Sequence, residues 1–231
     1  SDTNEYIGAV TKKITTNEPY APDISSFDKE TTYYVVYDGD NETRISIKEN
    51  TPSNWYDYSN QKWANIVTTA NGTETYFVWI PRYKYEIFNV GNYSSATTVD
   101  TAPTTSAAQE INIVFESKDI TPSTGSTVGS YLTHPAFTTL DVNGIWVAKF
   151  EPSGTTSDID IIPNVASLGS VNVKTMFETA YNYDRSLDSH MMKNSEWGAV
   201  AYLTHSKYGR NGTEVTINNV SANNTNTIYA V

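Results

Sequence analysis

The sequence predicts an α+β fold, in which a largely β body carries two short helices. The composition is the first reason: Thr, Ser, Asn and the 17 tyrosines are abundant while Leu is scarce. A core of aromatic and β-branched residues favours sheets over helical bundles. The second reason is that only residues 170–209 space their apolar side chains at the three-and-four interval of a helix. At 231 residues the chain is long enough to bury a sizeable core.

The first helix is expected over residues 171–183. Its predicted apolar face consists of Val173, Met176, Phe177 and Ala180. The hydroxyl of Ser170 is expected to cap the free N–H groups at its start. We expect the apolar face to dock on the β body.

The second helix is expected to follow a short extended piece, residues 190–193. Ser195 is its predicted cap, and Glu196 is well placed for the positive end of the helix dipole. Its predicted apolar stripe is Trp197, Val200, Ala201 and Thr204. Lys207 falls in the last turn, and Gly209 is the predicted left-handed stop.

Residues 1–26 have no sustained period and are expected to form a lead-in segment. A β-hairpin is expected next, because two β-prone runs flank Asp38-Gly39-Asp40-Asn41. Asp38, Asp40 and Glu42 also suggest the start of a calcium loop. The hairpin interpretation is favoured, since the later ligands and the glycine of an EF-hand loop are missing from the pattern.

An aromatic cluster, Trp55, Tyr56, Tyr58 and Trp63, opens the main domain. Aromatic faces can stack on sugar rings, so the cluster suggests a glycan platform. The alternative is that these rings are core in a chain short of Leu, and this interpretation is favoured.

Strands are expected over residues 74–88, interrupted at Pro81, and over residues 111–117 and 213–217. A further hairpin is expected at residues 141–144, with residues 145–151 as its buried return strand. Residues 91–108 are polar and of low complexity, which predicts a long surface loop.

Charge and composition exclude several classes of function. The formal charge of −11 disfavours binding to nucleic acid or to an anionic membrane. With no cysteine there is no thiol catalysis or thiolate metal site, and no run is apolar enough to insert in a membrane. His134, His190 and His205 are too scattered to suggest a metal site.

Acidic pairs offer no better candidate for a catalytic site. Asp158 with Asp160, and Asp184 with Asp188, are expected to be solvated loop acids, although a glycosidase pair drawn from distant positions stays open. The sequence therefore assigns no catalytic residue, no metal ligand and no cofactor, and leaves the binding residues unknown.

Six segments together carry a resemblance to a known family: WYDYSNQKWAN, YFVWIPRYKYEIF, INIVFESK, LTHPAF, IWVAKFE and HMMKNSEWGAVAYLTHSKYG, within residues 51–220. The last resembles the helix opening with Glu-Trp in the formylglycine-generating-enzyme branch of the C-type-lectin fold. The ordered set resembles uncharacterised surface, pilin-like and prophage-associated proteins of Gram-positive gut bacteria. The resemblance implies a C-type-lectin-like mixed β core with two short helices and long loops, preceded by a β-hairpin.

Departures from that family limit what the resemblance implies. The oxidase members need active-site cysteines, which this chain lacks, and no lectin-type calcium ligands are recognisable. The Gly-rich segment that closes the core in this fold is either replaced by residues 225–231 or missing from the sequence.

Together these observations predict an N-terminal extended segment and hairpin over residues 1–50 and a C-type-lectin-like domain over residues 51–231. The expected function is that of a non-enzymatic extracellular domain, displayed on a cell-surface filament or phage tail, which binds a polar or glycan-type partner. The first alternative is a structural subunit of a pilus-like filament that self-associates through residues 1–47. The second alternative is a glycan hydrolase.

Overall fold

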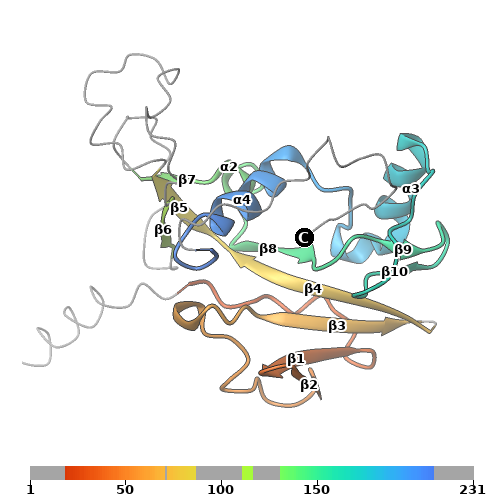
Figure 1. Ribbon diagram of the computed structural model, residues 1–231, viewed down its shortest axis with the longest axis horizontal. Coiled ribbons are helices and arrows are strands. Elements are labelled where there is room, and N and C mark those ends of the chain that lie inside the picture. Colours follow the sequence, from red (N-terminus) through yellow and green to blue (C-terminus); the bar gives the residue numbers. More distant parts are fainter. Residues whose placement is uncertain (1–18, 71, 87–110, 117–130, 211–231) are drawn as a thin grey trace, which may run out of the picture.

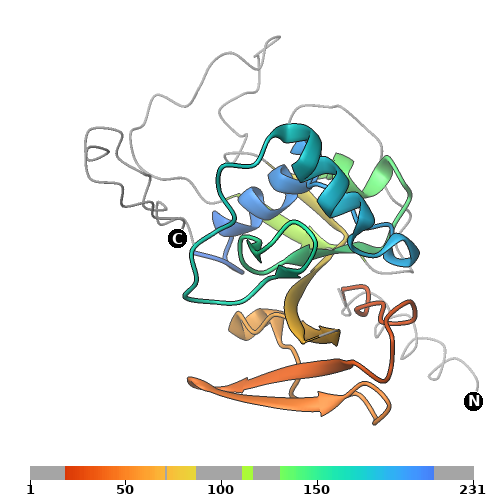
Figure 2. The ribbon, with the colours of Figure 1, turned by 90° about the vertical axis from the view of Figure 1, so that its right-hand side faces the viewer.

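The computed structural model describes residues 19–70, 72–86, 111–116 and 131–210, and it has an α+β fold built mostly of antiparallel strands (Figure 1). The largest sheet has the strand order β2-β1-β3-β4-β8. Its members are β1 (Thr32–Asp38), β2 (Asn41–Ser46), β3 (Asn65–Ala70), β4 (Thr73–Pro81) and β8 (Gly144–Ala148). Figure 2 shows β1, β2 and β3 on one side of the molecule and the longer helices on the other.

The predicted N-terminal hairpin is confirmed. β1 pairs with β2 in a register that sets Asp38 opposite Asn41, so Gly39 and Asp40 form the turn. Gly39 has a φ of 58°, a value that glycine adopts without steric cost. Because β1 also pairs with β3, the hairpin belongs to the main sheet. The boundary at residue 50 between two domains stays a prediction.

Pro81 ends one strand of the predicted pair, as expected. β5 (Tyr83–Glu86) begins two residues later and joins a second sheet of order β6-β5-β7, with β6 (Asn112–Phe115) and β7 (Leu132–Thr133). The strand predicted over residues 111–117 is therefore confirmed over residues 112–115, and residue 117 lies outside the described part of the chain. A small third sheet pairs β9 (Ser153–Gly154) with β10 (Ile159–Asp160).

The hairpin predicted at residues 141–144 is wrong. The chain directly before it forms a short helix, α2 (Pro135–Thr138), and β8 pairs with the distant β4 instead of with a strand on the other side of a tight turn. All five residues of β8 are half-buried, so it is also less enclosed than predicted. Gly144 opens β8 because β4 passes too close for a side chain: a Cβ there would lie 2.3 Å from the ring of Trp79.

The two longer helices are α3 (Val173–Tyr183) and α4 (Asn194–Thr204), close to their predicted ranges. Both predicted caps are wrong. Asn172 caps α3, since its side chain accepts a hydrogen bond from the Thr175 N–H at 2.9 Å. At α4 the N-cap is Lys193, whose N–H donates to the Glu196 carboxylate at 2.8 Å.

Two other expectations for α4 are corrected. The helix buries Glu196, Ala199 and Leu203, while Trp197, from the predicted apolar stripe, is 67% exposed. The glycines with positive φ in the described part of the chain are Gly39, Gly72 and Gly154. Gly209 is therefore not a left-handed stop.

Short 3-10 turns η1 (Tyr58–Asn60) and η3 (Arg185–Leu187) complete the described helical segments.

The aromatic cluster at the start of the main domain is core, as favoured. Trp55 and Tyr58 are buried, and the half-buried Tyr56 and Trp63 pack against the same clusters. The indole of Trp55 also donates to the Asn65 carbonyl at 2.7 Å inside the protein. The faces of these rings are consequently occupied by other side chains rather than free for sugar.

A buried ion pair ties the second sheet to the loop before β8. The guanidinium of Arg82 is 3% exposed and donates to the Glu116 carboxylate, which is 0% exposed, over 2.7 Å. Glu116 also accepts a hydrogen bond from the Thr133 hydroxyl. Arg82 donates further to the Val142 carbonyl at 3.1 Å. Burial of two charges is tolerated here because each is paired and hydrogen-bonded.

Part of the lead-in segment packs on the sheet. The indoles of Trp79 and Trp146 donate to the carbonyls of Tyr20 and Asp23 at 3.2 and 2.6 Å, and the next residue after the segment, Phe27, is buried. The loop predicted over residues 91–108, the strand predicted over residues 213–217 and the closing segment over residues 225–231 lie outside the described residues.

Candidate functional site

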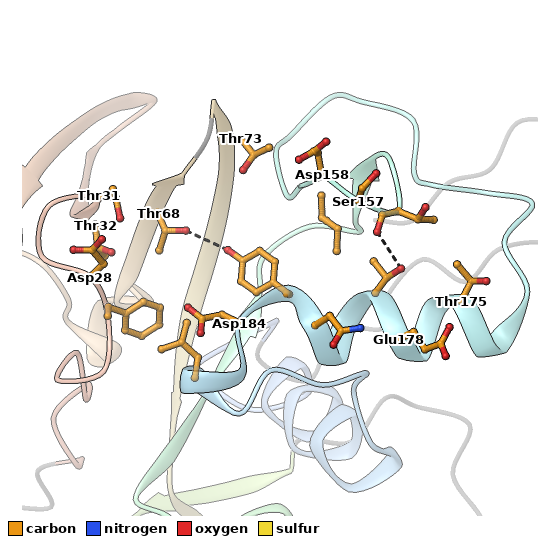
Figure 3. Close-up of a pocket in the computed structure, with 17 residues that line it drawn as sticks. Asp28, Thr31, Thr32, Thr68, Thr73, Ser157, Asp158, Thr175, Glu178 and Asp184 are labelled. Atoms are coloured by element: carbon orange, nitrogen blue, oxygen red, sulfur yellow. Dashed lines mark hydrogen bonds between the residues drawn. The ribbon is translucent and has the colours of Figure 1, made fainter.

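A pocket of about 510 Å³ lies between α3 and one end of the large sheet (Figure 3). This volume is in the range of small-molecule sites. Its wall is dominated by hydroxyl and carboxylate side chains. The lining residues are Phe27, Asp28, Thr31, Thr32, Thr68, Thr73, Thr156, Ser157, Asp158, Ile159, Thr175, Glu178, Thr179, Asn182, Tyr183, Asp184 and Leu187.

The sheet contributes threonines from adjacent strands. Thr32 of β1 lies opposite Thr68 of β3, and Thr68 lies opposite Thr75 of β4, so the three side chains share one face of the sheet. Thr68 Oγ1 lies 3.3 Å from the hydroxyl of Tyr183 and hydrogen-bonds with it. The end of an otherwise apolar sheet face is therefore polar where α3 crosses it.

Thr32 is the least satisfied of these threonines. Its side chain is 1% exposed and lines the pocket, yet its hydroxyl has no hydrogen-bond partner among the described residues. A buried hydroxyl without a partner costs about 1–3 kcal/mol. Protein atoms enclose Thr32 Oγ1, so a ligand in the pocket does not reach it.

α3 lies over the pocket with its polar face inward, which contradicts the predicted docking face. Val173, Met176 and Phe177 are exposed, and Ala180 is half-buried. The lining residues of the helix are instead Thr175, Glu178, Thr179, Asn182 and Tyr183. The physical reason is the surface beneath the helix: a row of threonines accepts a hydroxyl-bearing face better than an apolar one.

The turn between β9 and β10 forms another wall of the pocket. The hydroxyl of Thr179 donates to the Thr156 carbonyl at 3.3 Å, which joins this turn to α3. Asp160 anchors the turn to the sheet, since its carboxylate accepts the Glu74 N–H at 3.0 Å. The turn therefore presents Ser157 and Asp158 to the pocket from a fixed base.

Four carboxylates line the pocket: Asp28 before β1, Asp158 in the β9–β10 turn, Glu178 on α3 and Asp184 at its end. None of the described lining residues is Lys, Arg or His. Glu178 forms an exposed ion pair with Lys174 at 2.7 Å. The pocket wall is thus both rich in hydroxyls and negatively charged.

The acidic pairs considered from the sequence are divided by the structure. Asp158 and Asp184 line the pocket, whereas Asp160 and Asp188 do not. Asp184 also accepts the Ser186 N–H at 2.9 Å, which opens η3. The acids of the pocket therefore come together from separate segments and not as neighbours in the chain.

The acids proposed for a calcium loop have other roles. Asp38 ends β1, Asp40 is in the hairpin turn, and Glu42 forms an ion pair with Arg44 at 2.7 Å. Within the described ranges, no three His, Asp or Glu side chains are grouped as metal ligands.

The histidines serve the packing of the helices. His134 is 3% exposed, and its Nδ1 accepts the Ala136 N–H at 3.2 Å to cap α2. Burial lowers the pKa of His134 to about 4, which suits this acceptor role because the neutral ring is required. His205 is the C-cap of α4.

His190 pairs with the Glu196 carboxylate at 2.9 Å. Burial acts to lower the pKa of His190, but the hydrogen bonds with Glu196 and with the Asp188 carbonyl outweigh it, and the net change is a rise. Burial likewise acts to raise the pKa of Glu196, while the Lys193 N–H and His190 lower it overall. This pair fixes the entry to α4.

Comparison of the chain with protein-family models, with curated proteins and with solved structures found no match. In addition, no helix of the described residues has the length and apolar character to cross a bilayer.

Sequence reasoning did not identify the pocket. Thr32 and the threonines of α3 belong to elements that were predicted, whereas Thr68 belongs to β3, which was not, and all these side chains meet only after the sheet forms and α3 crosses it. The one signal in the sequence was the polar set Thr175, Thr179 and Asn182 on the helix, opposite the apolar face.

Proposed function

We propose that the protein is a non-enzymatic binding domain that holds a hydroxyl-rich, glycan-type ligand in the pocket beneath α3. The observation that carries the proposal is the lining itself, in which hydroxyl, amide and carboxylate groups surround about 510 Å³. Such groups offer both donors and acceptors to the hydroxyls of a sugar. The half-buried Tyr183 adds aromatic surface for its apolar faces.

The proposal extends to the setting of the domain. A C-type-lectin-like fold, and display on an extracellular filament or phage tail, rest on the resemblance of residues 51–220 alone. The α+β architecture and the antiparallel sheets are compatible with that fold.

Filament assembly is the second candidate function, and the position of β2 favours it. β2 is an edge strand of the large sheet and lies within residues 1–47, the segment expected to mediate assembly. An open edge can add a strand from another chain.

Because β1 supplies the buried Tyr34, Val35 and Val36, deletion of residues 1–47 would unfold the sheet. Deletion of residues 1–18 leaves β1 and β2 in place and is the better test, with sedimentation as the measure of self-association.

A filled-pocket variant tests the binding proposal. Ser157 lies at the exposed mouth of the pocket, so we expect Ser157→Trp to block ligand entry without touching the core. Ser167→Trp is the matched control, because Ser167 is exposed but does not line the pocket. On a glycan array, the wild type and the control should bind the same glycans and Ser157→Trp should bind none. Equal binding by all three proteins would refute the proposal.

A further inference from the structure

Resting on the proposed function, we propose that the sugar held beneath α3 carries a free, protonated amine. The pocket lining combines four carboxylates with at least eight hydroxyl or amide side chains and no basic side chain among the described residues. The hydroxyls match the hydroxyls of a sugar, and the carboxylates match an ammonium group. An amino sugar unites both chemistries in one ring.

The carboxylates reach the pocket from three segments, namely the chain before β1, the β9–β10 turn and α3 with its C-cap, so a ligand meets acidic groups on several sides. Asp28 and Asp184 each use one oxygen to hold a local turn, through the N–H groups of Glu30 and Ser186 at 2.9 Å. The carboxylate of Asp158, in contrast, accepts no hydrogen bond among the described residues, although its backbone groups do bond. Asp158 is therefore the strongest candidate for the ammonium partner.

Glu178 is the second candidate, because its present partner is exposed. Lys174 lies on the same helix, and both side chains of the pair are at least half exposed. An exposed i,i+4 pair is weak. A ligand ammonium inside the pocket can replace Lys174 at little cost.

The charge of the lining also determines which saccharides the pocket rejects. Acidic saccharides are excluded by repulsion, since no described lining residue offers a positive charge to them.

The test compares three oligosaccharides of equal length: a glucosamine oligomer, an N-acetylglucosamine oligomer and a galacturonic acid oligomer. Calorimetry on the full chain should give the glucosamine oligomer an affinity about twofold to fivefold above that of its N-acetylated form at low salt. The advantage should shrink at 0.5 M salt, where the Debye length is about 4 Å. The galacturonic acid oligomer should not bind.

Variants separate the pocket from the general negative charge of the protein. Asp158→Asn and Glu178→Gln should each lower the preference for the glucosamine oligomer, and together should abolish it. Asp40→Asn is the control, since Asp40 is exposed in the β1–β2 turn outside the pocket. An equal loss in the control would mean adsorption of a polycation and would overturn the inference.

The remaining outcomes distinguish this inference from the proposed function. If the glucosamine and N-acetylated oligomers bind equally, and Ser157→Trp abolishes both, the amine specificity is wrong and the glycan site stands. If the galacturonic acid oligomer binds best, the charge argument is also wrong. If none of the three binds and the glycan array is blank as well, both proposals fail.

Discussion

Replacement of Glu116 by Gln is expected to be the most costly of the conservative substitutions considered for this protein. The side chain is 0% exposed and faces an Arg82 guanidinium that is 3% exposed, with 2.7 Å between Nε and Oε2. Glutamine keeps the volume of the side chain, so no cavity forms. What is lost is the charge that compensates Arg82. Breaking a buried ion pair from one side costs about 3–5 kcal/mol.

The surroundings of the pair place Glu116→Gln near the lower end of that range, at about 3 kcal/mol. Arg82 keeps its bonds to the Val142 and Phe137 carbonyls at 3.1 and 3.3 Å. It also keeps a long contact with Asp141 at 3.4 Å, but that side chain is 92% exposed and compensates little. For a chain of this size the loss corresponds to a fall in Tm of about 6–12 °C.

Urea unfolding followed by tryptophan fluorescence measures the effect. The control is Glu30→Gln, which breaks the exposed Glu30–Lys48 pair and should change the free energy of unfolding by less than about 0.5 kcal/mol. The double variant Arg82→Met with Glu116→Met removes both charges and should be more stable than Glu116→Gln. A cost below about 1 kcal/mol for Glu116→Gln, or a double variant less stable than the single one, would refute the reasoning.

Three further predictions concern single residues. Burial lowers the pKa of His134 from 6.5 to about 4, so between these pH values the unfolded chain binds a proton that the folded chain does not. The free energy of unfolding, measured with urea at several pH values, should therefore fall by about 3 kcal/mol as the pH drops from 6.5 to 4. His134→Asn keeps a capping oxygen and should lose this dependence on pH. Gly144→Ala should cost about 1–3 kcal/mol by overpacking, whereas Gly169→Ala, with no atom within 4 Å of its Cβ, should not lower Tm. Trp197→Ser should change Tm by under about 2 °C, since Trp197 is 67% exposed. A large fall in Tm would mean that Trp197 packs against the protein, as the predicted apolar stripe of α4 requires.

Local sequence signals predicted the elements well where the signal and the structure act over the same short range. The hairpin turn at Gly39 and Asp40 depends on two residues, and its position is confirmed. The break at Pro81 is also confirmed, because proline has no N–H to donate to a continuing ladder. Helix ranges came within a few residues, since the apolar spacing that predicts a helix extends over several turns.

The same spacing could not tell which face of a helix meets the protein. Val173 and Phe177 mark an apolar face on α3, and Thr175 and Thr179 mark a polar one, but the sequence does not say what lies beneath. The usual rule places the apolar face inward. Here the surface beneath is the threonine end of the sheet, so the polar face turns inward and the pocket forms.

The sequence by itself determined the fold class, the first hairpin, the two longer helices and the aromatic character of the core, because each follows from residues close together in the chain. Only the tertiary structure decided that β8 joins β4, that Arg82 meets Glu116, and that Thr32 and Tyr183 border one cavity. These contacts join residues from about 30 to 150 positions apart, so they depend on how the whole chain packs and leave no local pattern to read.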